Sequence, residues 1–464
     1  MFVLEKTTDQ FQELRSQVLG QVLEPHEPGF AQASQGWSLG HKHQPKAVLV
    51  AKTTADIVAA VQFAQVHGLA IAVQATGHGF VRAADDALLI NLAGLTKVQV
   101  NPASQTATVQ AGASWAQVLK AASPYGLTGL LGDTPSVGAV GYTLGGGMGW
   151  FGRKYGLGCD ALLEAQVVTM DGQLRTVSAE HQAELFWGLK GGAGGLAIVT
   201  EMTIKLYLES AVTAAQFVFP LEYARQAMEG YREWLKRVPD ELSSRLMFAH
   251  GPDVPFLPPF LRNQTALIIQ AVYAGPETEA AKTLEALSFI PGSIAQIINR
   301  IRPAELGMFF GAPPAPSESV GQAEQLSEFS DEVIELALAF AKSQPAPFYM
   351  FELRQLGGAV ANISHEVTAF AHRNAAFLLN YHALVFSPEV RAKSQLSVSA
   401  FSKLFAPVAS GEIMPNFLNG DEGEARDHAA YPGLKSMRLA MLKARFDPEN
   451  RLRYARTPGS RSGA

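Results

Sequence analysis

Apolar blocks with two different spacings follow one another near the start of the chain. The run PKAVLVAK (45–52) is short and apolar, which is typical of a strand. The next residues, TTADIVAAVQFAQVHG (53–68), repeat their apolar positions at helical spacing, begin on threonines that favour an N-cap and end on a glycine. The apolar run LAIAVQA (69–75) follows. We therefore expect a β-α-β unit over residues 45–75.

Three glycine-rich segments lie in the first half of the chain. The first surrounds His78 in TGHGF, the second is TPSVGAVGYTLGGGMGWFGRKYG (134–156), and the third is GLKGGAGGLAIVTEMTIKL (188–206). Strand-like pieces separate them, and one, EAQVVTMDGQLRTV, carries an Asp-Gly pair that predicts a hairpin turn. The third segment leads into a strand-like run.

The pattern changes after about residue 207. Phenylalanine and proline become more frequent, and long helical patterns appear in EYARQAMEGYREWLKRV and FSDEVIELALAFAKS. Two proline-rich pieces, GPDVPFLPPFLRNQ and GAPPAPSESVGQ, predict loops. From about residue 405 the chain is polar and helical again, which suggests that it returns to the first part.

Composition narrows the class of protein. With 47% hydrophobic and 17% charged residues among 464, the chain suits a globular protein with a large core, and its net charge of -5 gives no reason to expect a nucleic-acid partner. The single cysteine, Cys159, excludes an internal disulfide and a cysteine-based metal cluster. No apolar run reaches the roughly 18 residues of a membrane span. The N-terminal residues form an amphipathic helical pattern without the apolar region of a signal peptide, so we expect a cytoplasmic protein.

The glycine-rich segments could bind a phosphate group through backbone N–H groups. None is a P-loop, because the lysine of G-x-x-x-x-G-K-[ST] is absent, and none matches a dinucleotide-binding fingerprint. Taken alone, they leave nucleotide binding open.

Taken in order, these segments and the closing RLAMLKARFDPENRLR resemble the FAD-linked oxidases of the vanillyl-alcohol oxidase type, and within them the berberine-bridge-enzyme-like branch. The resemblance implies an α+β fold: a PCMH-type FAD-binding domain of two α/β subdomains, with an inserted substrate domain of antiparallel sheet covered by helices. The implied boundaries are 1–206 for the N-terminal part of the FAD-binding domain (its core about 41–207), 207–404 for the substrate domain and 405–464 for the C-terminal return.

The resemblance also implies a role for His78. In this family the histidine of the loop after the second strand carries FAD covalently through the 8α-methyl carbon. The flanking glycines, Gly77 and Gly79, would let the loop approach the cofactor closely. The alternative is a turn histidine without a function. The positions that the resemblance assigns to FAD binding are Ala75, Thr76, Gly77, His78, Gly79, Phe80, Thr134, Pro135, Val137, Gly138, Gly141, Tyr142, Gly145, Gly149, Tyr155, Gly195, Ile198, Val199 and Asn416.

One departure concerns a second covalent link. Many relatives attach the flavin also through a cysteine in C-P-[ST]-V-G, and this chain has TPSVG, with Thr134 at the cysteine position. Threonine forms no thioether. Cys159 lies in YGLGCDALL, where we expect a small core residue. We therefore expect one covalent bond, through His78.

A second departure concerns the general base. The tyrosine of the family's Y-x-N element is Met414 here, in MPNF, although Asn416 is retained. A thioether accepts no proton at neutral pH. Tyrosines common around the pocket are also replaced, by Phe80 and Met148, and Asn380 takes the place of a glutamine. The substrate pocket is therefore expected to be more apolar than one built for sugars. Its expected members are Met148, Met350, Arg354, Asn380 and Met414.

A carboxyl group remains for proton transfer. In FYMFELRQLGG (348–358), alternation places Met350, Glu352 and Arg354 on one face of a strand. A singly linked flavin oxygenase of the enterocin type resembles this arrangement with a glutamate there. Glu352 is a base if burial raises its pKa, or else a partner in a salt bridge with Arg354 or another cation. We name Glu352, Asn416 and Tyr142 as catalytic candidates. The histidines at 365, 372 and 382 lack metal-ligand spacing, so we expect surface or interdomain histidines and no metal.

These features predict a flavin-dependent oxidase that transfers a hydride from an organic substrate, aromatic or polyketide-like, to flavin N5, with O2 as acceptor giving H2O2. The alternatives are an oxygenase of the enterocin type and a flavin-binding protein without catalysis. The expected partners are a small-molecule substrate and oxygen. We expect no nucleic acid and no membrane, and a homodimer is compatible with the family.

Overall fold

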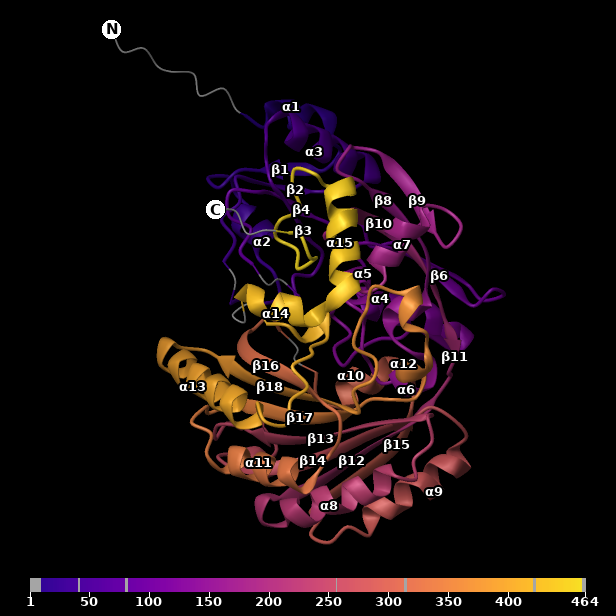
Figure 1. Cartoon of the computed structure of the whole chain (residues 1–464), viewed down its shortest axis with the longest axis vertical. Coiled ribbons are helices and arrows are strands. Elements are labelled where there is room, and N and C mark those ends of the chain that lie inside the picture. The colour runs from indigo at the N-terminus through magenta and orange to yellow at the C-terminus, as the bar shows by residue number, and fades with distance from the viewer. Residues whose placement is uncertain are drawn as a thin grey trace.

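The computed structural model describes residues 10–40, 42–79, 82–255, 257–312, 315–419 and 423–460. In these residues the strands form four sheets, and Figure 1 shows two layers along the long axis of the molecule. The smaller sheets lie in the upper layer with the N-terminal half of the chain. The largest sheet forms the lower layer.

The first sheet contains the expected β-α-β unit. Its order is β1-β2-β4-β3, with β2 and β3 both parallel to the central β4. The strands are β1 (Gln21–Leu23), β2 (Ala47–Val50), β3 (Ile71–Gln74) and β4 (Leu88–Asn91), and helix α3 (Thr54–Val66) joins β2 to β3. The expected unit over 45–75 is confirmed.

Helix α3 begins where the threonines predict. The Asp56 N–H donates to the Thr53 hydroxyl at 3.2 Å, and the Thr53 N–H donates to the Asp56 carboxylate at 3.1 Å, which makes a capping box. The Asp56 carboxylate also accepts the N–H of Leu19, so the cap ties the N-terminal segment to the helix. Burial would raise the pKa of Asp56, but the backbone N–H groups of Lys52 and Leu19 lower it below its usual value.

A second sheet of five strands packs beside the first. Its order is β5-β6-β10-β8-β9. The strands are β5 (Val98–Asn101), β6 (Thr106–Gln110), β8 (Leu162–Val168), β9 (Leu174–Ser178) and β10 (Ile198–Lys205), and a small pair joins β7 (Leu127–Thr128) to β11 (Tyr207–Leu208). Strands β8 and β9 are antiparallel and turn at Asp171-Gly172, where Gly172 has φ +73°, so the expected hairpin is confirmed.

The helices of this part are mostly short. Their bounds are α1 (Gln12–Gln17), α2 (Phe30–Ser34), α4 (Trp115–Ala122), α5 (Ala139–Leu144), α6 (Gly152–Tyr155) and α7 (Ala183–Leu189). Helix α1 covers part of the expected N-terminal helix, and the first nine residues of that prediction lie outside the described residues.

The third large sheet is antiparallel and has seven strands in the order β15-β12-β14-β13-β17-β18-β16. They are β12 (Val212–Pro220), β13 (Leu242–His250), β14 (Thr265–Tyr273), β15 (Ala295–Ile301), β16 (Glu318–Leu326), β17 (Tyr349–Gln355) and β18 (Phe377–Val385). Helices α8 (Ala224–Leu235), α9 (Glu277–Ser288), α11 (Asp331–Lys342) and α13 (Pro388–Phe405) cover its lower face, where they share one apolar core with the strands (Figure 1).

The upper face of this sheet is turned toward the N-terminal part. Helices α10 (Leu306–Phe309) and α12 (Ala359–Asn362) lie between the layers, next to α6 (Figure 1). Residues Val272, Ala323 and Leu378 of the sheet belong to the same core cluster as the strands of the upper layer. The expected α+β fold, with an antiparallel sheet covered by helices, is therefore confirmed. The boundaries at residues 206 and 404 stay a prediction.

The last segment returns to the upper layer. Helices α14 (Gly423–Ala430) and α15 (Gly433–Phe446) lie over the N-terminal part in Figure 1. Lys443 is buried and pairs with Asp447 at 2.6 Å, and it also donates to the Gly195 carbonyl at 2.9 Å. The Thr457 hydroxyl accepts the Gly195 N–H at 2.8 Å. The C-terminal segment therefore fixes the loop that precedes β10.

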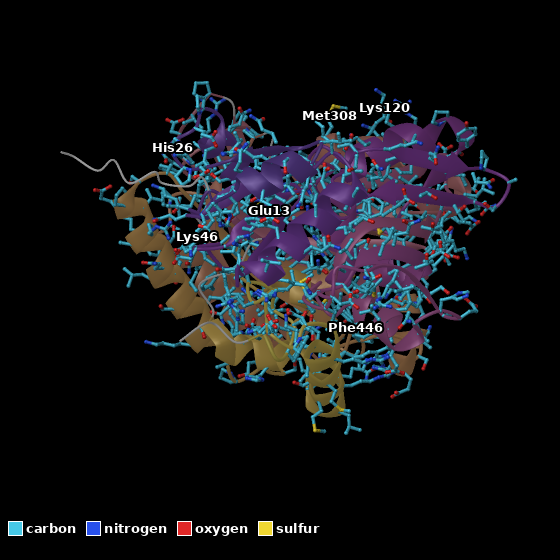
Figure 2. The ribbon with its side chains drawn as sticks, turned by 90° about the horizontal axis from the view of Figure 1, so that it is seen from above. Glu13, His26, Lys46, Lys120, Met308 and Phe446 are labelled. Atoms are coloured by element: carbon cyan, nitrogen blue, oxygen red, sulfur yellow. The ribbon has the colours of Figure 1, made fainter. Side chains whose placement is uncertain are left out.

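In the view from above, Lys120 and Met308 lie at the edge of the molecule (Figure 2). Among the described residues, no helix has both the length and the apolar composition needed to cross a bilayer.

The buried pair of Lys443 and Asp447 yields the first prediction. Replacing Asp447 with alanine leaves the ammonium of Lys443 buried without its counter-charge, and we expect a loss of about 3–5 kcal/mol of unfolding free energy. Urea unfolding followed by circular dichroism measures it. As a control, Glu335→Gln removes an exposed partner of Arg225 and should leave the midpoint unchanged. Equal midpoints for Asp447→Ala and wild type would contradict the prediction.

Candidate active site

The loop that carries His78 follows β3 and is held by an N-terminal segment. The Trp37 N–H donates to the Thr76 carbonyl at 2.9 Å, and the Ser38 N–H donates to the Gly77 carbonyl at 3.1 Å. Gly77 has φ +73°, and a Cβ at this position would lie 2.4 Å from the Gly36 Cα. Glycine at 77 is therefore required both by its backbone conformation and by the close contact with Gly36.

The His78 imidazole is half-buried between two loops. Its Nδ1 lies 2.8 Å from the Thr76 hydroxyl oxygen, and its Nε2 lies 3.3 Å from the Ser136 hydroxyl oxygen. The Trp37 ring stacks on one face, with centroids 4.4 Å apart and planes at 15°. Burial lowers the pKa of His78 to about 4, so the ring is neutral at physiological pH.

The TPSVG element lies against this histidine. Ser136 is its contact with the imidazole, and the Gly138 N–H donates to the Thr76 hydroxyl oxygen at 3.1 Å. Pro135 packs against Gly307 at the start of α10, where a Cβ on the glycine would lie 2.5 Å from the proline ring. Two of the glycine-rich segments named from the sequence thus meet at one place.

The triple glycine after α5 is held by Asn416. The Gly147 N–H donates to Asn416 Oδ1 at 2.6 Å, and Asn416 Nδ2 donates to the Tyr142 carbonyl at 3.2 Å. A Cβ at Gly145 would lie 2.6 Å from the Asn416 amide, so the loop and the asparagine fit without space for a side chain. Asn416 lies in a turn of Pro415–Phe417, far along the chain from the glycines.

Polar atoms without a partner border these loops. The Tyr142 and Thr143 hydroxyls and Gln74 Oε1 are buried, and no described group hydrogen-bonds to them. Gly141, between Gly138 and Tyr142, is exposed, and a Cβ there would meet nothing within 4 Å. Buried polar atoms are normally satisfied, so these atoms fit a polar cofactor that lies on the loops. The residues present are thus compatible with a bound FAD.

A cluster of charged side chains joins the TPSVG loop to the seven-stranded sheet. Asp133, directly before Thr134, accepts hydrogen bonds from Arg245 on β13, at 3.0 Å, and from Arg354 on β17. The same two arginines pair with Glu352 on β17, at 2.9 and 3.3 Å. Two cations and two anions therefore share one site at the junction of the layers, where Asp133 is half-buried and the other three side chains are buried.

The pKa of Glu352 is set by this cluster. Burial would raise it, but the charges of Arg354 and Arg245 and a hydrogen bond from Asn380 Nδ2 outweigh burial and the Asp133 charge, so the pKa lies below its usual value. The carboxyl is 7% exposed and ionised. The condition set for a base, a pKa raised by burial, is not met, because the two arginines lie within hydrogen-bond distance. The salt-bridge alternative describes the observed contacts.

Aromatic rings complete the cluster. The guanidinium groups of Arg245 and Arg354 lie 5.0 and 5.6 Å from the centroid of the Trp150 ring, which itself stacks on Phe310. The Tyr142 hydroxyl has a pKa well above its usual value, so it stays protonated. Burial is the main cause, and the Asp133 charge is the second. Tyr142 packs edge-on against Trp115.

Several sequence-predicted residues therefore lie together. The structure joins Thr76, His78, Thr134–Gly138, Tyr142, Gly145 and Asn416 around the loops, and Glu352, Arg354 and Asn380 on the sheet. The register pairs Glu352 with Asn380, and it pairs Met350 with His382. Paired residues point to the same face, so all of these sheet residues are turned toward the upper layer.

Other predicted residues have different surroundings. The Tyr155 hydroxyl donates to Glu209 at 2.6 Å, and its ring stacks on Tyr207. Met148 and Met414 are buried in the core of the upper layer, as are Gly195, Ile198 and Val199. The roles of these residues in binding FAD or substrate stay predictions. Phe80 lies outside the described residues.

Sequence reasoning missed three members of the site. Asp133 directly precedes the TPSVG element, and its position next to a motif was an available signal. Trp37 and Arg245 belong to no motif, and only the fold brings them to His78 and Glu352. His382 was expected at the surface or between domains; it is half-buried on the same sheet face, and burial lowers its pKa while the Glu352 charge raises it.

Two other histidines named from the sequence and the cysteine lie away from this cluster. His372 is buried and lies 2.6 Å from the Ala429 carbonyl of α14, whereas His365 contacts Ala371 and Asn374. Burial, and secondly the Asp160 charge, raise the pKa of the Cys159 thiol far above the usual range, so it stays protonated. Within the part of the chain that the structure describes, no group of histidine, cysteine and acidic residues is arranged to hold a metal ion.

Comparison with known proteins agrees with this geometry. Residues 45–178 match the model of the FAD binding domain family. The chain is 26% identical over 454 residues to the FAD-linked oxidoreductase YgaK of Bacillus subtilis, covering 95% of this chain and 97% of that protein. It is also 26% identical over 460 residues to glucooligosaccharide oxidase of Sarocladium strictum, covering 90% of this chain and 89% of that protein.

A solved structure has the same fold. The 6-hydroxy-D-nicotine oxidase of Arthrobacter nicotinovorans superposes with a TM-score of 0.85 at 21% identity, over 95% of this chain and 98% of that chain. The fold is therefore that of the PCMH-type FAD-binding oxidases. Over nearly its full length, the chain is similar to FAD-linked oxidoreductases.

The charge cluster yields a prediction about pH. In the wild type, the lowered pKa of Glu352 contributes stability above its unfolded pKa, and this contribution is lost as the pH falls through the folded value. Arg245→Gln removes one of the two cations. Burial then raises the pKa values of the Asp133 and Glu352 carboxyl groups, and the ionised cluster has two negative charges against one positive charge. Protonation of a carboxyl group at low pH removes this excess negative charge. We therefore expect the variant to lose more unfolding free energy at about pH 7 than at about pH 4.5.

Urea unfolding at both pH values measures this difference. Arg225→Gln, at an exposed ion pair with Glu335, is the matched control and should change little at either pH. An equal or larger loss at the lower pH would show that Arg245 does not control the ionisation of these carboxyls.

Proposed function

We propose that this protein is an FAD-dependent oxidase whose substrate binds between the glycine loops and the upper face of the seven-stranded sheet. The observation that carries the proposal is the position of Asp133. It belongs to the loop that contacts His78, and it pairs with Arg245 and Arg354 beside Glu352. The loops suited to FAD and the polar groups of the sheet therefore meet at one junction.

When bound, FAD would supply a hydride acceptor that O2 can reoxidise, giving H2O2. Loops 75–79 and 134–145 would hold it, with His78 as its covalent attachment. Thr134, at the position of the second attachment in many relatives, offers no thiol, which supports a single link. Asn416 would stabilise the conformation of the triple-glycine loop through its hydrogen bonds to Gly147 and Tyr142.

Glu352 would orient the substrate and accept its proton. The carboxylate is ionised and accepts hydrogen bonds from Arg245, Arg354 and Asn380, and it could accept one more from a hydroxyl or another donor of the substrate. Its lowered pKa makes it a weak base. A phenol or an enolisable carbonyl has a more acidic proton than a sugar hydroxyl. A weak base such as Glu352 can therefore remove it more easily.

The surroundings of Glu352 support an aromatic or polyketide-like substrate. Met350 precedes it on the same face and is 44% exposed, and Met247, Ala249 and Ile268 form an apolar cluster on that face. Trp150 adds an aromatic surface behind the arginines. The similarity to glucooligosaccharide oxidase keeps a carbohydrate as the competing substrate class. An oxygenase of the enterocin type and a non-catalytic flavin protein are the alternative functions.

The covalent link can be tested directly. Acid-precipitated wild-type protein should stay yellow, and His78→Ala should release FAD into the supernatant because the attachment point is gone. Mass spectrometry should locate the flavin adduct on the peptide that contains His78. Ser136→Ala, which keeps the imidazole, is the control and should retain a covalent adduct. An adduct on another residue, or none, would contradict the assignment.

The role of Glu352 can be tested by anaerobic flavin reduction across a panel of phenols, polyketide-like compounds and oligosaccharides. Aromatic substrates should bleach the flavin, and Glu352→Gln should slow the bleaching by at least about tenfold if the carboxylate accepts the proton. Glu324→Gln, at another buried ion pair of the sheet, with Arg426, is the matched control.

Three results would change this proposal. An unchanged reduction rate in Glu352→Gln would reduce Glu352 to a structural ion-pair partner. Rapid oxidation of unmodified oligosaccharides would contradict the substrate class. A flavin that no compound reduces would favour a non-catalytic protein.

A further inference from the structure

We propose that two copies of this chain associate through strand β15 (Ala295–Ile301), which pairs antiparallel with the β15 strand of the second copy across a twofold axis at Ile298. The seven-stranded sheets of the two copies then form one continuous sheet. The surface lies outside the candidate active site, so this inference does not depend on the proposed activity.

Strand β15 is an open edge of the seven-stranded sheet. It pairs with β12 on one side, and among the described residues no strand pairs with its other side. Figure 1 shows it at the right of the lower sheet, above α9. In an antiparallel pair, alternate residues direct their backbone N–H and C=O groups away from the neighbouring strand. From Gln296 to Ile301, the backbone makes no hydrogen bond to a described backbone segment other than β12, so these groups can bind a further strand.

The opposite edge of the same sheet is closed. Strand β16 is buried along most of its length. The Ser410 N–H donates to the Gln325 carbonyl at 2.8 Å, and the Arg426 guanidinium of α14 donates to the Ala323 carbonyl at 2.5 Å. In β15, by contrast, the five central residues are exposed. The fold therefore covers one edge of the sheet and leaves the other accessible.

Strand β15 lacks the features that commonly protect an edge. Edge strands often carry prolines or charged side chains on their open side. This strand has no proline, and its one charged residue, Arg300, donates to the Gly275 carbonyl of its own chain at 3.1 Å. Four apolar side chains at this edge are between 44% and 75% exposed: Phe289, Ile294, Ile297 and Ile298. An exposed apolar edge of this kind favours a protein partner.

The sequence of β15 suits pairing with itself. Ile298 is the central residue of seven, so a twofold axis at Ile298 pairs every residue of one strand with a residue of the other. Gln296 is then opposite Arg300, and Ile298 is opposite its own copy. No two like charges are opposed, and the same surface serves both copies, as a twofold interface requires.

Helix α9 runs beside β15 and is centred near the same axis. Gln296 Nε2 lies 3.5 Å from the Ser288 carbonyl oxygen at the C-terminal end of α9, whereas Arg300 reaches Gly275, just before the N-terminal end. The middle turns of the helix are therefore level with Ile298. A twofold axis there relates the middle turns of two α9 helices in antiparallel orientation.

The charges on these middle turns are complementary across the axis. Lys282 and Glu285 are both exposed and have opposite signs. In the antiparallel arrangement, Lys282 of one copy is on the side of Glu285 of the other, and the pairing occurs twice by symmetry. Within its own chain, Lys282 pairs at 2.9 Å with the exposed Glu279, a contact that stabilises little. This complementarity favours a second copy over an unrelated extended peptide as the occupant.

Sedimentation velocity of the full-length protein from about 1 to about 100 μM provides the first test. Wild type should approach twice the mass of one chain as the concentration rises. Ile298→Lys places two like charges at the axis and should raise the dimer dissociation constant at least about tenfold. Leu434→Lys, at a residue that is 79% exposed on α15, is the matched control and should dimerise like wild type. A wild type that stays monomeric at the highest concentration would overturn the inference.

A cysteine at position 298 tests the geometry of the interface. Directly opposed residues of antiparallel strands are close enough for a disulfide, and the native Cys159 is fully buried. Under oxidation with diamide, Ile298→Cys should give a cross-linked dimer on non-reducing electrophoresis, and the control Leu434→Cys should not. A wild-type dimer whose Ile298→Cys variant forms no cross-link and whose Ile298→Lys variant still dimerises would place the interface elsewhere and overturn the inference.

Discussion

The arrangement of the candidate site depends on one carboxylate that two arginines share. Asp133 comes from the upper layer, whereas Arg245 and Arg354 come from two adjacent strands of the lower sheet. Neither guanidinium could be buried at the junction without an anion, because an unpaired buried charge is costly. Asp133 and Glu352 together neutralise the pair. This pairing fixes the distance between the loop that contacts His78 and the strand that carries Glu352.

The local elements could be predicted from the sequence, and the contacts between them could not. Threonine, glycine and the spacing of apolar residues define α3, β2 and β3, because capping and burial act over a few residues. The strand character of 348–358 was likewise readable. The pKa of Glu352 was not, since it depends on Arg245, which lies over a hundred residues earlier and in no motif. Trp37 was missed for the same reason: it reaches His78 through backbone pairing between distant segments.

The site combines a neutral histidine with an ionised glutamate, although burial acts on both side chains. Burial without a nearby anion keeps His78 uncharged, whereas burial with two cations keeps Glu352 charged. Each state suits the role proposed for the residue: a nucleophilic nitrogen in one case and a hydrogen-bond acceptor in the other. For the proposed role of Glu352, its weak basicity implies a substrate whose own proton is acidic.

The bonds of Lys443 and Thr457 to Gly195 have a consequence for the order of folding. These residues lie 248 and 262 positions after Gly195, so the loop before β10 reaches its observed contacts only after residues 443–457 have docked on it. A change in this late segment would therefore act on a glycine-rich loop in the first half of the chain.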